Sequence, residues 1–523
     1  MKAYFRSQQW QQNAVVRIGI VSLTMAFIAI GCSPQSPAKP AASTGKPDTE
    51  LAEAETPDAA TDSNISEAWD AIYVGGTHVG YSHTTKRQPP DSNGEIEITS
   101  DTEIGLKRFG TETHQSIHIQ SVEIPNGQLK SASSTMSSGT GSVATEITNS
   151  GDKLVVVNKA GQGSTTIELP ADCLGIGGFE PDLQKDPMQA GETRTYRTFV
   201  PLMNTVGTTT LTALHLEETK LLGETRALLR IENAMTLPGG NSINVTMWAD
   251  GRGDILKTDM SGLQTTYRTT REKAIPSSTA NAVDLGTQSL VRLDQPIESP
   301  HQTKHIRYLV KTKNGVSKDL IPESEWQHVA QVDSNTIRLD VQMPRPANSQ
   351  NDSTAPPAEF TASNSMIQKD AEAITLLAAQ VPNGASTWET VCRLESFVST
   401  LIDEKNFSTA FASAEEVAKS KQGDCTEHSV LLCALCRAKN VPSRCTAGLV
   451  YSSPHQAFAF HMWTEAWIDG HWIPLDATLG IGGIGAAHIK ISDTSFADGG
   501  GFESMLPVIQ LIGNLEIDVE KIE

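Results

Sequence analysis

Short runs of alternating apolar and polar residues dominate the chain between residues 69 and 275. Alternation with a period of two places every second side chain on one face of a β-strand. The first run surrounds Gly75-Gly76, a pair typical of a tight hairpin turn. Further runs cover residues 94–100, 114–124, 152–169 and 242–260. We therefore predict an antiparallel β domain over residues 67–275.

A second group of alternating runs lies between residues 285 and 345. The sequences HIRYLVK (residues 305–311) and TIRLDVQM (residues 336–343) both alternate, with turn residues between them. We predict a second β segment over residues 285–345. The stretch over residues 346–362 is rich in Pro, Ser and Asn, which is typical of a linker.

The apolar spacing becomes helical beyond this linker. Residues 366–380, 386–402 and 413–420 each predict a helix with one apolar face. The run over residues 425–439 is apolar nearly all round, which predicts a buried helix. These helices open a C-terminal domain that we place at residues 363–523.

Cys425 is expected at the N-terminus of the buried helix. The sequence Asp424-Cys425-Thr426-Glu427 fits a capping box, with Asp424 as the N-cap residue and Glu427 as its partner. A helix N-terminus lowers the pKa of a thiol, whereas neighbouring carboxylates disfavour a thiolate. A reactive Cys425 therefore needs a histidinium partner, and Gly423 would let a substrate backbone come close.

A candidate histidine partner for Cys425 lies in residues 460–480, FHMWTEAWIDGHWIPLDATLG. Asp469-Gly470 lies between two alternating runs and predicts a two-residue hairpin turn. The resulting register pairs Ile468 with His471 and brings His461 onto the same face as Asp476, within reach of a hydrogen bond. A thiol, an imidazole and an orienting carboxylate are the parts of a cysteine acyl-transfer site.

Three stretches together resemble the catalytic core of the transglutaminase-like superfamily: GDCTEH at residues 423–428, ALCRAKNVPSRCTAGLV at residues 434–450, and the hairpin over residues 460–480. The resemblance implies that Cys425 is the nucleophile, His461 the base and Asp476 the orienting acid. Ala477 and Met462 depart from the family pattern without removing a reacting group.

The same resemblance implies a papain-like core reacting through a thioester. We therefore expect an α+β fold, in which a β-rich antiparallel N-terminal region precedes helices packed on an antiparallel sheet. The backbone N–H of Cys425 and an upstream group, for which Gln422 is a candidate, would stabilise the oxyanion. Apart from the resemblance, Trp463, Trp467 and Trp472 could line a groove for the acyl donor, although packing in the core of the sheet explains Trp467 equally well. Calcium serves some animal members, but no calcium loop is recognisable here, and we expect no metal or cofactor.

Less specific interpretations stay open for each of these residues. Cys425 and His461 are also plausible core residues, and Asp476 could be a solvated strand end. His428 lies one helical turn from Cys425 and could be the base instead. Cys433-x-x-Cys436, with Cys445, could also belong to a redox or metal protein, although buried packing explains these thiols more simply.

The N-terminus resembles a bacterial export signal. Basic residues precede the short apolar stretch over residues 18–32, which ends in Ala29-Ile30-Gly31-Cys32, a sequence similar to a lipobox. We expect cleavage before Cys32 and lipidation of its thiol, or alternatively an uncleaved signal anchor. Residues 33–66 contain few large apolar side chains and predict a disordered tether. Without Cys32 and Cys425, five cysteines remain, an odd number that does not indicate a disulfide framework.

A formal net charge of −20 argues against nucleic acid as a partner. We expect a lipoprotein of the bacterial cell envelope, periplasmic or at the outer membrane, that acts on a protein or peptide substrate. Hydrolysis of a peptide or amide bond is favoured over transfer to an amine. The alternative is a non-catalytic envelope scaffold that binds peptides. The sequence does not indicate an oligomeric state.

Overall fold

The computed structural model describes residues 65–523, apart from residues 140, 159–163, 261, 278–282, 314–319, 347–354, 405–411 and 498–502. The expected export signal and lipidated Cys32, and all but the last two residues of the expected tether, lie outside the described residues. No helix among the described residues is long and apolar enough to cross a membrane.

Strands account for 48% of the structure and helices for 18%. The expected α+β fold with helices packed on a papain-like sheet is therefore wrong as a description of this chain. Large antiparallel sheets dominate, because alternating sequence patterns extend over far more residues than the helical patterns do.

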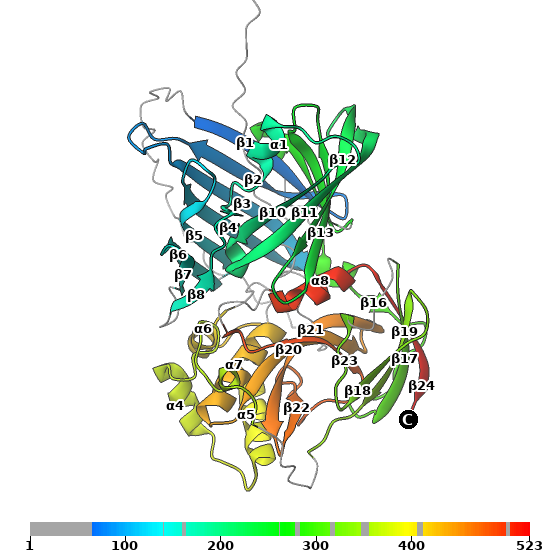
Figure 1. The fold of residues 1–523 in the computed structure, drawn as a ribbon. Helices are drawn as coiled ribbons and strands as arrows, with labels where there is room; N and C mark the ends of the chain where they lie inside the picture. Colours follow the sequence, from blue (N-terminus) through cyan, green and yellow to red (C-terminus); the bar gives the residue numbers. More distant parts are fainter. Residues whose placement is uncertain are drawn as a thin grey trace, which may run out of the picture.

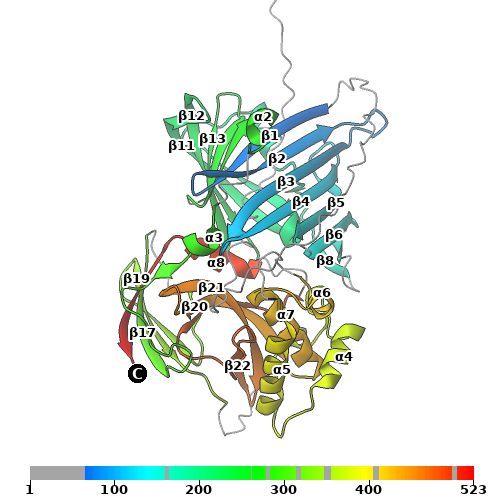
Figure 2. The same cartoon turned by 180° about the vertical axis from the view of Figure 1, so that it is seen from behind.

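The largest sheet has fifteen strands in the order β8-β7-β6-β5-β4-β3-β2-β1-β15-β14-β13-β12-β11-β10-β9. Its first strand, β1, pairs with its last strand in sequence, β15, so the two ends of this region meet in the middle of the sheet. The sheet curves strongly, and its two halves face each other in both views (Figures 1 and 2). The strands are β1 (Ile65–Val74), β2 (Thr77–Arg87), β3 (Ile96–Arg108), β4 (Thr111–Glu123), β5 (Leu129–Ser138), β6 (Gly141–Asn149), β7 (Lys153–Asn158), β8 (Ser164–Glu168), β9 (Cys173–Leu174), β10 (Thr193–Val200), β11 (Thr205–Lys220), β12 (Thr225–Thr236), β13 (Ser242–Ala249), β14 (Ile255–Met260) and β15 (Gln264–Thr269).

The alternating sequence explains how this sheet forms. In β3, buried and partly exposed positions alternate along nearly the whole strand, as expected where only one face of a strand packs into a core. The helical pieces in and after this region are short: α1 (Glu180–Lys185), α2 (Arg271–Ala274) and α3 (Leu285–Gln288).

Two smaller sheets complete the structure. One has the order β16-β21-β20-β23, with β22 paired to β21, and the other has the order β18-β19-β17-β24. The C-terminal strand β24 pairs with β17, so the chain end closes a sheet begun about two hundred residues earlier. The strands are β16 (Val291–Arg292), β17 (His305–Thr312), β18 (Gln327–Gln331), β19 (Thr336–Gln342), β20 (Ser443–Ser452), β21 (Ala457–Ile468), β22 (His471–Leu475), β23 (His488–Thr494) and β24 (Leu515–Ile522).

Four helices lie beside the sheet of β20 and β21 (Figure 1). They are α4 (Glu372–Gln380), α5 (Thr387–Leu401), α6 (Ala414–Ser420) and α7 (Cys425–Ala438), and a fifth, α8 (Leu506–Leu511), follows near the C-terminus. Helix α7 lies in the middle, because it contacts α4, α5 and α6 as well as β20 and β21. The first predicted helix is shorter than expected and begins at Glu372 rather than at residue 366.

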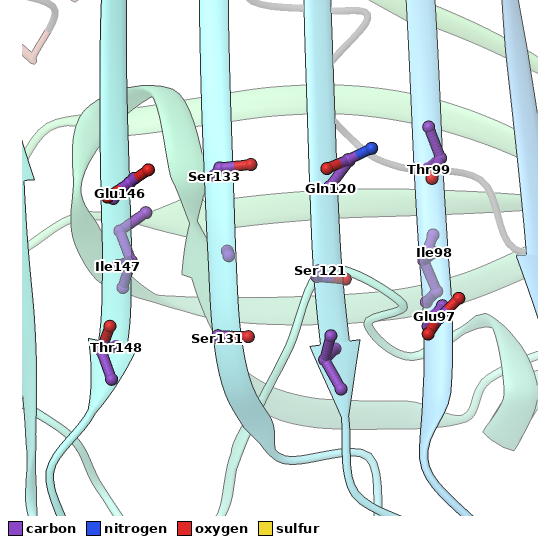
Figure 3. A pocket seen from close by; sticks show the side chains of 12 residues that line it. Glu97, Ile98, Thr99, Gln120, Ser121, Ser131, Ser133, Glu146, Ile147 and Thr148 are labelled. Carbon is purple, nitrogen blue, oxygen red and sulfur yellow. The ribbon is translucent and has the colours of Figure 1, made fainter. Parts of the chain in front are cut away.

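A polar trough of about 480 Å³ lies on strands β3–β6 of the large sheet. Figure 3 shows two rows of side chains across these strands, one formed by Thr99, Gln120, Ser133 and Glu146. None of the candidate site residues lines this trough.

Candidate active site

Helix α7 presents Cys425 as its first residue. The carboxylate of Asp424 accepts the N–H of Thr426 at 2.9 Å, and the Glu427 side chain accepts the N–H of Asp424 at 2.9 Å. This is the predicted capping box, which satisfies N–H groups that have no partner inside the helix. Cys425 is fully buried, as is nearly all of α7.

The β21–β22 hairpin brings His461 and Asp476 together. The predicted register is confirmed, since Ile468 pairs with His471 and Thr464 with Leu475. Asp476 directly follows β22, and its Oδ2 atom lies 2.8 Å from Nε2 of His461. Both side chains are fully buried, so solvent screens their interaction little.

His461 also interacts with Cys425. Burial alone would lower the pKa of His461, but the charges of Asp476 and Cys425, with hydrogen bonds to both, raise it to about 10. His461 in turn holds the pKa of Asp476 well below its usual range, against the effect of burial. The Nδ1 atom of His461 is buried and has no partner of standard hydrogen-bond geometry among the described residues. The three predicted residues thus meet in one buried cluster with an ionised imidazolium–carboxylate pair.

A second histidine shares Asp476. Nε2 of His488, at the start of β23, lies 3.2 Å from Oδ2 of Asp476. Burial lowers the pKa of His488, so His488 is neutral and donates this hydrogen bond. The ring of His301 lies beside His488, with 5.7 Å between the ring centroids, and burial lowers the pKa of His301 to about 4.

The ligand atoms of His461, Asp476 and His488 lie within 4.8 Å of one another, close enough to hold a metal ion. Both imidazoles, however, direct Nε2 at the same carboxylate oxygen with hydrogen-bond distances. A metal would require an unprotonated Nε2 on each ring, whereas contacts of 2.8 and 3.2 Å to a carboxylate oxygen place a proton on each Nε2. The donor chemistry therefore fits proton positioning better than metal binding.

Glu395 supports the loop that carries Asp476. This residue of α5 is fully buried, and its Oε1 atom accepts the backbone N–H of Asp476 at 3.0 Å and that of Gly483 at 3.2 Å. Burial raises the pKa of Glu395 to about 8. Glu395 was not predicted from the sequence, although an acid inside the apolar face of a predicted helix is an available signal.

The remaining predicted residues lie around this cluster in different ways. Gly423 is buried with φ of +144°, and a Cβ there would meet Cβ of Glu427 at 2.3 Å, so packing of the capping box requires glycine. Gln422 is half-buried and forms an isolated bridge with Glu404. Trp463 is buried, with its ring 6.3 Å from that of His461, rather than lining an open groove.

The alternative base, His428, is held within its own helix. Its Nδ1 atom lies 2.6 Å from the backbone oxygen of Asp424, in the first turn of α7. Cys433, Cys436 and Cys445 are free and buried. Among the described residues, these thiols belong to no group of three metal ligands.

The comparison of the sequence with protein families agrees with this geometry. Residues 376–477 match the transglutaminase-like superfamily. The matched segment of the chain contains α5, α7, the β21–β22 hairpin and all three predicted catalytic residues. No curated protein matches the sequence.

Several solved structures share limited similarity with the chain. A proposed cysteine protease from Cytophaga hutchinsonii is 20% identical, with a TM-score of 0.28, and the match covers 37% of this chain and 81% of that one. A β-barrel-like protein from Brucella abortus is 10% identical, with a TM-score of 0.29, over 39% of this chain and 95% of that one. A proposed protease from Parabacteroides distasonis is 11% identical, with a TM-score of 0.18, and the match covers 74% of this chain and 64% of that one. TM-scores this low do not define a common fold.

Proposed function

We propose that the protein is a transglutaminase-like cysteine enzyme that forms a thioester with a peptide or carboxamide carbonyl and hydrolyses it. The observation that supports this most is the buried His461–Asp476 pair beside Cys425, at the start of a helix within the matched segment. These are the nucleophile, the base and the orienting acid that acyl transfer requires.

The first half-reaction forms the thioester. Cys425 reacts as a thiolate whose proton is held by His461, and this thiolate attacks the carbonyl carbon of the substrate. The tetrahedral intermediate then collapses as the C–N bond breaks, and His461 gives its proton to the departing amine. Asp476 holds the imidazole in orientation and stabilises its positive charge throughout.

The second half-reaction releases the product. Water loses a proton to His461 and attacks the thioester carbon, and the C–S bond breaks. The sulfur leaves as a thiolate beside the imidazolium of His461, which regenerates the resting site and releases a carboxylic acid. An amine attacking in place of water would give transfer instead, and water is favoured because it is the more abundant nucleophile.

The first turn of α7 suits the developing oxyanion. The N–H groups in the first turn of a helix have no acceptor inside the helix and point outward along its positive end. In this proposal the backbone N–H of Cys425 is one donor, and Gln422 is a candidate for the second. Because Cys425 is fully buried, a substrate reaches it only after a local opening of the structure.

The cellular context in this proposal is the bacterial cell envelope. It rests on the basic and apolar pattern that ends at Cys32. Lipidation of Cys32 would anchor the protein to a membrane through the tether, and the substrate would be an envelope protein or peptide.

The test uses the purified full-length protein and a library of peptides that contain Gln and Asn. Mass spectrometry separates cleavage, deamidation and incorporation of an added amine by their different mass changes. The Cys425→Ala variant should lose all activity, whereas Cys392→Ala, which removes a half-buried thiol of α5, should keep it. Activity retained by Cys425→Ala would refute the proposal, and binding without turnover by the wild type would favour a peptide-binding scaffold.

A further inference from the structure

The residue before Cys425 is bound by a side chain from the large sheet. Nη2 of Arg108 donates a hydrogen bond of 2.6 Å to Oδ2 of Asp424, across 316 positions of the chain. The two side chains are only 1% and 3% exposed. This ion pair thus joins the end of β3 to the N-cap of α7, and Oδ1 of the same carboxylate caps the helix through Thr426.

Carboxylates next to Cys425 would oppose a thiolate unless they are neutralised. Burial raises the pKa of Glu427 well above its usual range, and Asp424 raises it further. Asp424 is the carboxylate that directly precedes Cys425, and the guanidinium of Arg108 faces it. Among the described residues, the titratable or charged groups near this end of α7 are Asp424, Glu427 and His428 on the helix, Arg108 from β3, Glu404 beside Gly423, and the cluster of His461, Asp476 and His488.

Arg108 is fixed at the tip of a short hairpin. Phe109 and Gly110 connect β3 to β4 with φ of +47° and +83°, and their N–H groups donate to the two carboxylate oxygens of Asp284 at 2.9 and 2.8 Å. The N–H of Lys107 donates to the carbonyl of Val283 at 2.9 Å. The ring of Phe109 lies 5.6 Å from that of His455, which follows β20. The hairpin tip is thus held on both sides of Arg108, and the guanidinium loses little freedom in pairing with Asp424.

We propose that Arg108 is a positioning residue of the Cys425 site, which the large sheet contributes to the transglutaminase-like segment by neutralising Asp424 and fixing the N-terminus of α7. This inference rests on the proposed function, in which Cys425 is the nucleophile. It implies that residues 363–523 do not contain the whole site. It also assigns the sheet a direct part in the chemistry besides any role in substrate access.

The experiment measures the alkylation of Cys425 by iodoacetamide as a function of pH, in the full-length protein, with mass spectrometry as the readout. In Arg108→Met, the pH of half-maximal alkylation should rise by roughly one unit, because a carboxylate is left unpaired beside the sulfur. Asp424→Asn should shift it in the opposite direction, since Asn still caps the helix without a charge. The double variant Arg108→Met/Asp424→Asn should return close to the wild-type value, and Arg108→Lys should stay closer to it than Arg108→Met.

Arg268→Met is the matched control, since Arg268 pairs with Asp70 inside the same sheet at 3.1 Å. It should lower the melting temperature without moving the alkylation curve. An unchanged curve in Arg108→Met, or a shift that Asp424→Asn does not reverse, would overturn the role of Arg108. If Arg108→Met does not fold, Arg108→Lys takes its place: a smaller rise that Asp424→Asn reverses supports the proposal, and an unchanged curve counts against it.

The same data separate this inference from the proposed function. If the alkylation curve shifts in His461→Ala but not in Arg108→Met, Cys425 remains the nucleophile and only the proposed role of Arg108 is wrong. A wild-type curve like that of a free thiol, unchanged in His461→Ala, would mean that the proposed function itself is wrong.

Discussion

Nε2 of His461 lies 2.8 Å from Oδ2 of Asp476, and neither side chain has any exposed surface. The pair joins a strand residue to the residue that directly follows the next strand of the same hairpin, so its geometry depends on backbone pairing rather than on flexible loops. A buried carboxylate in this position fixes both the orientation and the charge of the imidazole.

Replacing Asp476 with Asn should therefore reduce kcat/KM by about 10³–10⁴-fold, because the imidazole loses both its orientation and its counter-charge. Peptide turnover by the purified protein is the measurement, with circular dichroism to show that the variant folds. Asp518→Asn, which breaks only a surface pair with Lys311, should leave turnover unchanged. A loss smaller than tenfold in Asp476→Asn would exclude Asp476 as the orienting acid.

The pKa of about 10 for His461 predicts an alkaline limit of activity. Because this pKa is raised above the ordinary 6.5, the protonated ring stabilises the fold fully below pH 6.5, and that contribution is lost as the pH rises through about 10. Activity that depends on the imidazolium should persist to pH 9 or above, on the order of one unit below that pKa. In Asp476→Asn the residual activity should fall at a lower pH, and a pH–rate profile identical to that of the wild type would contradict this.

Glu395 should make stability depend on pH. Its pKa is raised from 4.5 to about 8 by burial, so the folded state binds this proton more tightly than the unfolded state does. The corresponding stabilisation is complete below pH 4.5 and is lost as the pH rises through about 8. The free energy of unfolding should vary less between these pH values in Glu395→Gln than in the wild type. The two variations should differ by on the order of a few kcal/mol.

Urea unfolding at a series of pH values measures this effect. Glu389→Gln, which removes an exposed acid from the same helix, is the control, because the pKa of Glu389 is lowered and the group is already ionised over this range. If the two variants show the same pH dependence, Glu395 is ionised in the folded protein at neutral pH.

Local rules predicted much of the candidate site. The capping box at Asp424 and the hairpin register after Asp469-Gly470 follow from residues a few positions apart, and both are confirmed. The register alone placed His461 near Asp476. Such features depend on backbone hydrogen bonds between near neighbours, which is why the sequence reveals them.

Distant contacts were not predicted. Arg108 lies 316 positions from Asp424, and Glu395 lies 81 positions from Asp476. The pairing of β24 with β17 is also set by the whole fold. No local pattern distinguishes these partners, because the packing of entire sheets and helices brings them together. The wrong α+β expectation has the same origin, since it extended the character of the matched segment to a chain dominated by strands.

Gly423 directly precedes Asp424, the N-cap residue of α7. Its φ of +144° is unfavourable for other residues, and a Cβ would meet Cβ of Glu427 at 2.3 Å. Gly423→Ala should cost about 1–3 kcal/mol from backbone strain and about 1–3 kcal/mol more from overpacking. Gly482→Ala is the matched control, because Gly482 has φ of +80° but nothing within 4 Å of a Cβ. Urea unfolding of both variants isolates the clash with Glu427, and equal losses would show that the capping box adapts to the extra methyl group.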